Sequence, residues 1–111
     1  MASVTPKKFG QGNIATTPGT LVYTAPTGIS SIVKCIDICN TTGGAITVSV
    51  YLVPSGDTAA AANALFYTIS VASNGTYQWL GTQVLDAGGF IQAIASATGC
   101  TINVGGGEYS T

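Results

Sequence analysis

Apolar and small polar residues alternate along most of this chain, with the period of two that is typical of a strand with one buried face. The clearest case is residues 45–53. One face of this segment holds Ile46, Val48, Val50 and Leu52, and the other face holds Thr47, Ser49 and Tyr51. Because the first face is purely aliphatic, we expect it to point into a core, together with Ile102 and Val104 from a strand near the C-terminus.

Other segments show strand patterns and are separated by turns rich in Pro, Gly and Asn. They are residues 21–25, 29–40, 65–71, 76–80, 90–97 and 100–104. A parity break at Val33 and Lys34 predicts a β-bulge. Residues 54–64 are expected to form a long loop with about one helical turn, capped by Asp57 or Thr58. Short strands at this spacing predict an all-β fold, an antiparallel β-sandwich of about seven or eight strands, either jelly-roll or immunoglobulin-like.

Both ends of the chain lack this pattern. Residues 1–18 contain prolines, glycines and a lysine pair without any period, so we expect an extended N-terminal arm outside a sandwich domain of residues 19–111. The arm would order on a partner, with Lys7 and Lys8 meeting carboxylates and Phe9 entering an apolar groove. The glycine-rich residues 104–109 lack the Lys and Ser or Thr of a phosphate loop and are expected to be flexible.

Two segments, ALFYTI and FIQAIA, offer apolar side chains to both faces. A strand of this kind packs one face in its own core and the other against a neighbour. We therefore expect an oligomer interface that includes Phe66, Tyr67, Phe90 and Ile91. The composition supports this expectation, because 3 Lys+Arg and 4 Asp+Glu in 111 residues leave a surface too poor in charge to remain uncovered.

Residues suited to catalysis are scarce. The chain has no histidine, and its carboxylates lie in or near different predicted turns or strands, so we assign no catalytic residue and expect no enzyme activity and no small-molecule substrate. Asp37 shares a strand face with Cys35 and Cys39 and has Lys34 nearby. This arrangement leaves a thiolate site open, although a solvated surface charge is the simpler interpretation.

Cysteine spacing and charge limit the other classes of site. Without histidine or a C-x-x-C pair, neither a metal nor another cofactor is expected. Cys35 and Cys39 would lie roughly 13 Å apart in one strand, at ~3.3 Å per residue, so these two and Cys100 are expected to be free thiols in a reducing cytosol. Three lysines without arginine do not suit nucleic acid. We find no signal peptide and no apolar run of the roughly 18 residues that a membrane span needs.

Two further patterns have alternative interpretations. Asn40 and Asn74 fall in glycosylation sequons, but both stand where a turn favours asparagine. Tyr77 and Trp79 share a strand face and could stack on a sugar, although such pairs usually fill cores or interfaces. A module that binds host glycans at a fibre tip is therefore one alternative function.

A resemblance to known proteins rests on seven segments in order: TPKKFGQG, LVYTAPTG, SIVKCIDICNTTG, VSVYLVPSG, ANALFY, GTYQWLGTQVLDAGGFIQAIAS and TINVGGGEY. Taken together, they resemble the small β-rich virion proteins encoded among the structural genes of tailed bacteriophages. The resemblance implies a cement or decoration protein, made in the host cytoplasm, that binds the major capsid protein on the outside of the phage head. It also implies a homotrimer at sites of local threefold symmetry. A tail, neck or baseplate component is the alternative within this class.

Overall fold

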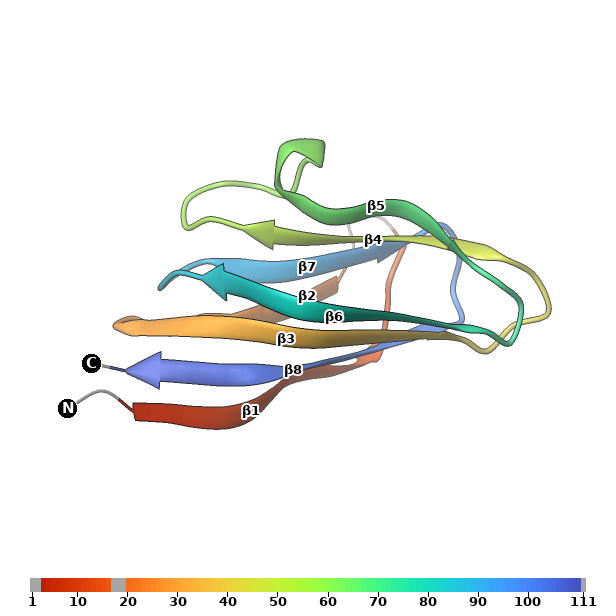
Figure 1. Ribbon diagram of the computed structural model, residues 1–111. Coiled ribbons are helices and arrows are strands. Elements are labelled where there is room, and N and C mark those ends of the chain that lie inside the picture. The colour runs from red at the N-terminus through yellow and green to blue at the C-terminus, as the bar shows by residue number, and fades with distance from the viewer. Residues whose placement is uncertain (1–2, 17–19, 111) are drawn as a thin grey trace.

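The computed structural model describes residues 3–16 and 20–110 and confirms the all-β prediction. Two antiparallel four-stranded sheets pack face to face as a sandwich (Figure 1). Sheet A contains, in spatial order, β1 (Ser3–Asn13), β8 (Cys100–Ser110), β3 (Ile29–Asn40) and β6 (Thr76–Leu85). Sheet B contains, in the same sense, β2 (Thr20–Thr24), β7 (Phe90–Ala95), β4 (Ile46–Val53) and β5 (Ala64–Val71).

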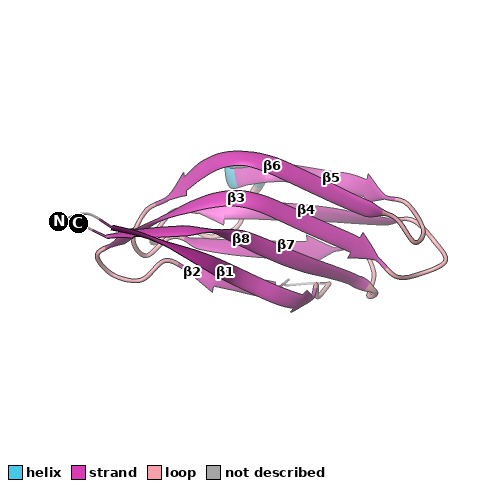
Figure 2. Cartoon of the chain, turned by 60° about the horizontal axis from the view of Figure 1, so that its bottom comes forward, coloured by secondary structure: helices cyan, strands magenta, loops and turns pink. Residues whose placement is uncertain are grey.

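The strand order makes this sandwich a jelly roll. Consecutive strands alternate between the two sheets except at the β4–β5 pair, and β8 returns to lie between β1 and β3. This connectivity is that of two Greek keys wound together. It excludes the immunoglobulin-like alternative, whose first strand would pair with the second rather than with the last. In Figure 2, β1 and β2 lie along one margin of the sandwich, and β5 and β6 lie along the other.

The core lies between the sheets and is largely aliphatic. The inward positions predicted from alternation are confirmed, with exposed fractions of at most 3%, for Ile46, Val48, Val50, Ile102 and Val104. Leu52 is only partly buried and packs at the margin of the core. Each fully buried aliphatic side chain contributes roughly 1.5–3 kcal/mol, so the core can hold the sandwich without a disulfide. The three cysteines are free thiols.

The regular pairing of strands in sheet A is interrupted by β-bulges that lie at the same level of the sheet. The bulge predicted in β3 is confirmed, because Val33 pairs with Gly106 of β8 while Cys35 pairs with the adjacent Gly105, which leaves Lys34 as the extra residue. Such a bulge bends the strand and reverses the parity of the residues beyond it. The alternation on one side of Lys34 therefore does not continue on the other.

The edge strand β1 has its own bulge at the same level of the sheet. Lys8 pairs with Gly105 and Gly10 pairs with Val104, so Phe9 is the extra residue. The bulge turns the Phe9 ring into the core, where it is 6% exposed and stacks on Tyr23 with 4.2 Å between ring centroids.

The prediction of a free N-terminal arm is therefore wrong for the described part of residues 1–18. Ser3–Asn13 pairs with β8 along its whole length, and the following Ile14 is 1% exposed. A polar strand with few apolar residues is held here by backbone hydrogen bonds and one buried ring, neither of which leaves a period in the sequence. Phe9 is consequently a core residue and not a partner-binding one. Residues 1–2 and 17–18 of the predicted arm lie outside the described residues.

Other element bounds also differ from the prediction. β6 continues five residues past Leu80 to Leu85, and β8 continues past Val104 to Ser110, so the glycine-rich end is a paired strand and not a flexible tail. The loop after β4 holds a short 3₁₀ helix, Ala61–Asn63. Neither Asp57 nor Thr58 caps this helix with its side chain; instead, the Ala60 N–H donates to Oδ1 of Asn63 at 3.1 Å. No helix in the described ranges is long and apolar enough to cross a bilayer.

Candidate protein-binding faces

The carboxylates of this protein are dispersed. Asp37 lies on β3, Asp57 and Asp86 lie in loops, and Glu108 lies near the end of β8. Within residues 3–16 and 20–110, no three His, Cys, Asp or Glu side chains come together in a way that could hold a metal ion. The remaining candidate functional sites are the buried polar clusters and the outer faces of the two sheets.

Glu108 belongs to a polar cluster that joins four strands. The Tyr23 hydroxyl donates to Oε2 of Glu108 and lies 2.8 Å from Oγ of Ser31, and Nζ of Lys7 lies 3.4 Å from the same Glu108 oxygen. Burial and the hydrogen bond to Glu108 raise the pKa of Tyr23 to about 12. The hydrogen bond from Tyr23 lowers the pKa of Glu108, with a further contribution from Lys7. Lys7 thus meets a carboxylate of its own chain, and its contact with a partner stays a prediction.

The carboxylate of Glu108 in this cluster predicts that the fold loses stability in acid. A carboxyl group whose folded-state pKa lies below its usual 4.5 stabilises the fold fully above that value, and this contribution is lost as the pH falls through the folded-state pKa. We expect the thermal midpoint of the wild type to fall more steeply below about pH 4.5 than that of Glu108→Gln. Asp86→Asn, in an exposed loop, is the control and should keep the wild-type slope. Equal slopes for all three proteins would contradict the cluster.

The other candidate charges stay on the surface. Lys8 is exposed on β1 and donates to Oε1 of Gln11 at 2.8 Å. Cys35, Asp37 and Cys39 share the outer face of β3 as predicted, since Ile36 and Ile38 between them are buried. The ammonium of Lys34, however, lies 2.8 Å from Oγ1 of Thr82 on β6. The structure therefore directs the lysine of the suggested thiolate site toward the neighbouring strand.

The aromatic pair on β6 faces the interior of the sandwich. Tyr77 and Trp79 are half-buried and pack against the core, and the Tyr77 ring lies 5.2 Å from that of Phe66. Gly81 leaves room for the Trp79 ring, because a Cβ at this position would lie 2.8 Å from it. These rings fill the margin between β6 and β5 and do not form a platform for a sugar.

The Asn40 sequon also has a structural explanation. Asn40 is fully buried, and its Nδ2 donates to the carbonyls of Gly44 at 2.8 Å and Val71 at 3.0 Å. Its Oδ1 accepts from the Thr42 N–H at 2.9 Å. A glycan on this amide would break these contacts. Asn74 has a φ of 54° in the turn before β6, as expected of a turn asparagine.

The outer face of sheet A, which we call face A, carries exposed apolar side chains. Strand pairing aligns residues from all four strands in two neighbouring rows, Pro6–Gly107–Ile32–Val84 and Lys8–Gly105–Cys35–Leu80. Leu80 is 68% and Val84 is 60% exposed. Large apolar side chains that are this exposed and lie together are typical of interaction surfaces.

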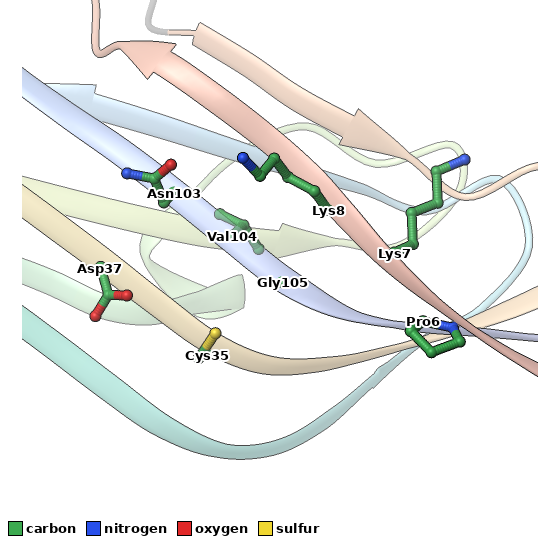
Figure 3. Close-up of a pocket in the computed structure, with 8 residues that line it drawn as sticks. All are labelled: Pro6, Lys7, Lys8, Cys35, Asp37, Asn103, Val104 and Gly105. Atoms are coloured by element: carbon green, nitrogen blue, oxygen red, sulfur yellow. The ribbon is translucent and has the colours of Figure 1, made fainter.

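A hollow lies on face A beside these rows. Its volume is about 440 Å³, and it is lined by Pro6, Lys7, Lys8, Cys35, Asp37, Asn103, Val104 and Gly105. In Figure 3 the ribbon of β8 is bare at Gly105, with Cys35 of β3 on one side and Pro6 and Lys8 of β1 on the other. Because Gly105 has no side chain, the β8 backbone at this position forms the floor of the hollow.

The outer face of sheet B, which we call face B, has a different character. Leu21 and Tyr67 are exposed there, at 61% and 55%, and the Tyr51 ring meets the Tyr67 ring edge-on at 6.4 Å. The row Leu21–Gln92–Tyr51 crosses three strands of the sheet. The loop after β4 returns over this face, where Thr58 and Ala59 border a hollow together with Tyr51 and Gln92.

The burial of side chains in sheet B tests the four residues predicted to form an oligomer interface. Phe66 and Ile91 are 9% and 0% exposed and belong to the core, so they are wrong as interface residues. Tyr67 is exposed, and Phe90 lies on the opposite side of β7 from Ile91 and is half-buried. The apolar character of both faces of these strands is real, but alternation assigns only one residue of each adjacent pair to the surface.

No protein family matches this chain, and neither a curated protein nor a solved structure shows significant similarity to it. Sequence reasoning missed Leu80 and Val84 as surface residues, because the predicted strand ended at Leu80. The signal was the further strand-forming residues in TQVL, but Gly81 before them and the irregular pairing opposite Lys34 hide their parity.

Proposed function

We propose that this chain is a non-enzymatic structural protein of a phage virion, a cement or decoration protein that binds the outside of the head and bridges capsid subunits. The observation that supports the proposal is that both outer faces of one sandwich carry exposed apolar side chains and few charges: Leu80 and Val84 on face A, and Leu21 and Tyr67 on face B. A body with two such faces can contact two partners at once, which is what bridging requires.

The buried polar groups fit a structural role. Asn40 and the Tyr23–Ser31–Glu108 cluster make hydrogen bonds that connect strands. No buried side-chain nitrogen or oxygen in the described part of the chain lacks a partner. A catalytic site usually keeps a group with a shifted pKa beside a cleft, whereas the raised pKa of Tyr23 belongs to a buried hydroxyl that is hydrogen-bonded between strands. The polar groups here support rigidity, which a cement protein needs in order to transmit load between subunits.

Head attachment is assigned to face B. With β1 paired in sheet A, an N-terminal arm no longer accounts for binding. Face B offers the tyrosine pair and the adjoining hollow, and tyrosine is enriched in the central contacts of protein interfaces. Its rim is nearly free of charge, so contact with a capsid would rest on apolar area and on hydroxyl hydrogen bonds.

Co-sedimentation with purified virion parts tests this proposal. The wild type should bind heads of tailed phages that have been stripped of their surface proteins, and Tyr67→Ser should weaken binding by roughly 30-fold, the effect of losing a central interface residue. Tyr109→Ser removes an exposed tyrosine outside face B and should bind as the wild type does. Binding to isolated tails alone would replace the head assignment with the tail alternative. Binding to neither would overturn the virion role.

A further inference from the structure

We propose that face A is a self-association surface, on which two copies of this chain pack face to face about a two-fold axis. The inference goes beyond head attachment and does not depend on it, because it concerns the opposite side of the sandwich. It also differs from the homotrimer that the resemblance implies, since a two-fold contact closes with two copies.

Face A has both a projecting and a receding part. Leu80 and Val84 project on the outer side of β6, and the hollow with Gly105 as its floor lies two strands away, toward β1. The walls of the hollow include Pro6 and the Cys35 thiol, which are suitable contacts for an aliphatic side chain. A surface that carries both parts is complementary to itself, because each copy inserts its Leu80 side chain and receives that of the other.

The charges on face A also fit a second copy. Of the charged residues that line the hollow, Lys7 is already paired with Glu108, which leaves Lys8 on one side and Asp37 on the other. A two-fold arrangement can place Lys8 of one copy near Asp37 of the other, while Lys34, also exposed on β3, is held against Thr82 of β6 at 2.8 Å. A strongly acidic or strongly basic partner would find no complementary field on this face.

The size of face A is sufficient for a stable contact. Four strands at ~4.8 Å spacing and about eleven residues at ~3.3 Å span roughly 19 by 36 Å, or about 700 Å². Stable interfaces of standard size bury about 600–1,000 Å² on each partner, and face A falls in the lower part of this range. The face can therefore support a dimer without help from another part of the surface.

The open edge of sheet A beside Leu80 is a further reason to expect a second copy on face A. Natural sheets protect open edges with proline, lysine and bulges. The β1 edge has Pro6, Lys7, Lys8 and a bulge, whereas β6 has a register irregularity at Gly81 and Thr82 but no charged residue and no proline in Thr76–Leu85. A second copy seated on Leu80 and Val84 would shield this less protected margin.

Sedimentation equilibrium of the full chain tests the proposal. We expect a dimer at micromolar concentration, and we expect Leu80→Asp to raise its dissociation constant at least 30-fold, as for the loss of a central interface contact. Leu21→Asp places the same charge on an equally exposed leucine of face B and should leave the constant unchanged. Circular dichroism and the thermal midpoint show that both variants keep the fold. A monomer at these concentrations, a trimer, or a dimer weakened only by Leu21→Asp would overturn the proposal.

The Cys35 thiol provides a second readout. It lies in the hollow and is half-exposed, while Cys100 is buried. In a Cys39→Ser background, iodoacetamide should alkylate Cys35 several-fold more slowly above the dissociation constant than below it, and Leu80→Asp should remove this difference. A rate that does not depend on protein concentration in a dimeric sample would place the contact elsewhere and overturn the assignment to face A.

Discussion

Replacing Phe9 with alanine is expected to lower the free energy of unfolding by about 3–5 kcal/mol, the usual cost of removing a buried phenylalanine ring. The ring is 6% exposed and stacks on Tyr23 at 4.2 Å, so its loss opens a cavity between β1 and β2 that neither neighbouring strand can close without breaking its pairing. Urea denaturation measures the effect as a lower midpoint with an unchanged slope.

Lys8→Ala is the matched control for this substitution. Lys8 is the neighbouring residue but is exposed, and its hydrogen bond to Gln11 is a surface contact, so the free energy of unfolding should change by no more than about 0.5 kcal/mol. If Phe9→Ala left stability unchanged and abolished binding to heads, residues 3–13 would be a partner-binding arm after all. The paired position of β1 would then be wrong.

Gly106→Ala is the second substitution with a large expected effect. A Cβ at Gly106 would overlap the carbonyl oxygen of Ile32 on β3 and lie 2.9 Å from the Phe9 ring. The carbonyl belongs to a central strand and cannot move without disturbing pairing on both sides. We therefore expect a cost at or above the upper end of the roughly 1–3 kcal/mol that overpacking usually causes. Thermal and urea unfolding both measure it.

The adjacent Gly105 provides the control within the same strand. A Cβ there would lie 3.4 Å from Sγ of Cys35, which is close to an ordinary contact, and would project into the open hollow. Gly105→Ala should therefore change the free energy of unfolding by less than about 1 kcal/mol. Equal effects of the two substitutions would mean that the strands do not approach closely at the bulge, and that the glycine-rich end of the chain is loosely held.

Both large effects occur where the sequence predicted no regular structure. Polar composition predicts the arm and clustered glycines predict the flexible end, since both usually accompany disorder. In the fold, these two segments are β1 and β8, paired with each other from Ser3 to Asn13 and from Thr101 to Ser110. Gly106 of β8 must be a glycine because the Ile32 carbonyl of β3 and the Phe9 ring of β1 both crowd against it.

The two proposed surfaces would bind different partners. Face B, with Tyr67 and Leu21, is assigned to the head, and face A, with Leu80 and the Gly105 hollow, is assigned to a second copy. The experiments separate the two assignments, because Tyr67→Ser should weaken head binding at an unchanged association state. Leu80→Asp should change the association state directly.

The sequence by itself determined the elements whose alternation is regular or is broken at one identifiable point. The buried face of residues 46–53, the bounds of residues 29–40 and the bulge at Val33 and Lys34 are local properties, because a strand with one buried face must repeat every two residues. The scarcity of charge and the free cysteines also follow from composition and spacing.

Only the tertiary structure decided the rest. The bulge of β1 turns Phe9 inward through a register set by β8, which lies about 90 residues away in the chain, and no pattern within β1 records this register. The grouping of Pro6, Gly105, Cys35 and Leu80 on face A depends in the same way on the order of four strands that are distant in sequence. A surface assembled by such long-range pairing leaves no period in any single segment, so its residues become neighbours only when the sheet forms.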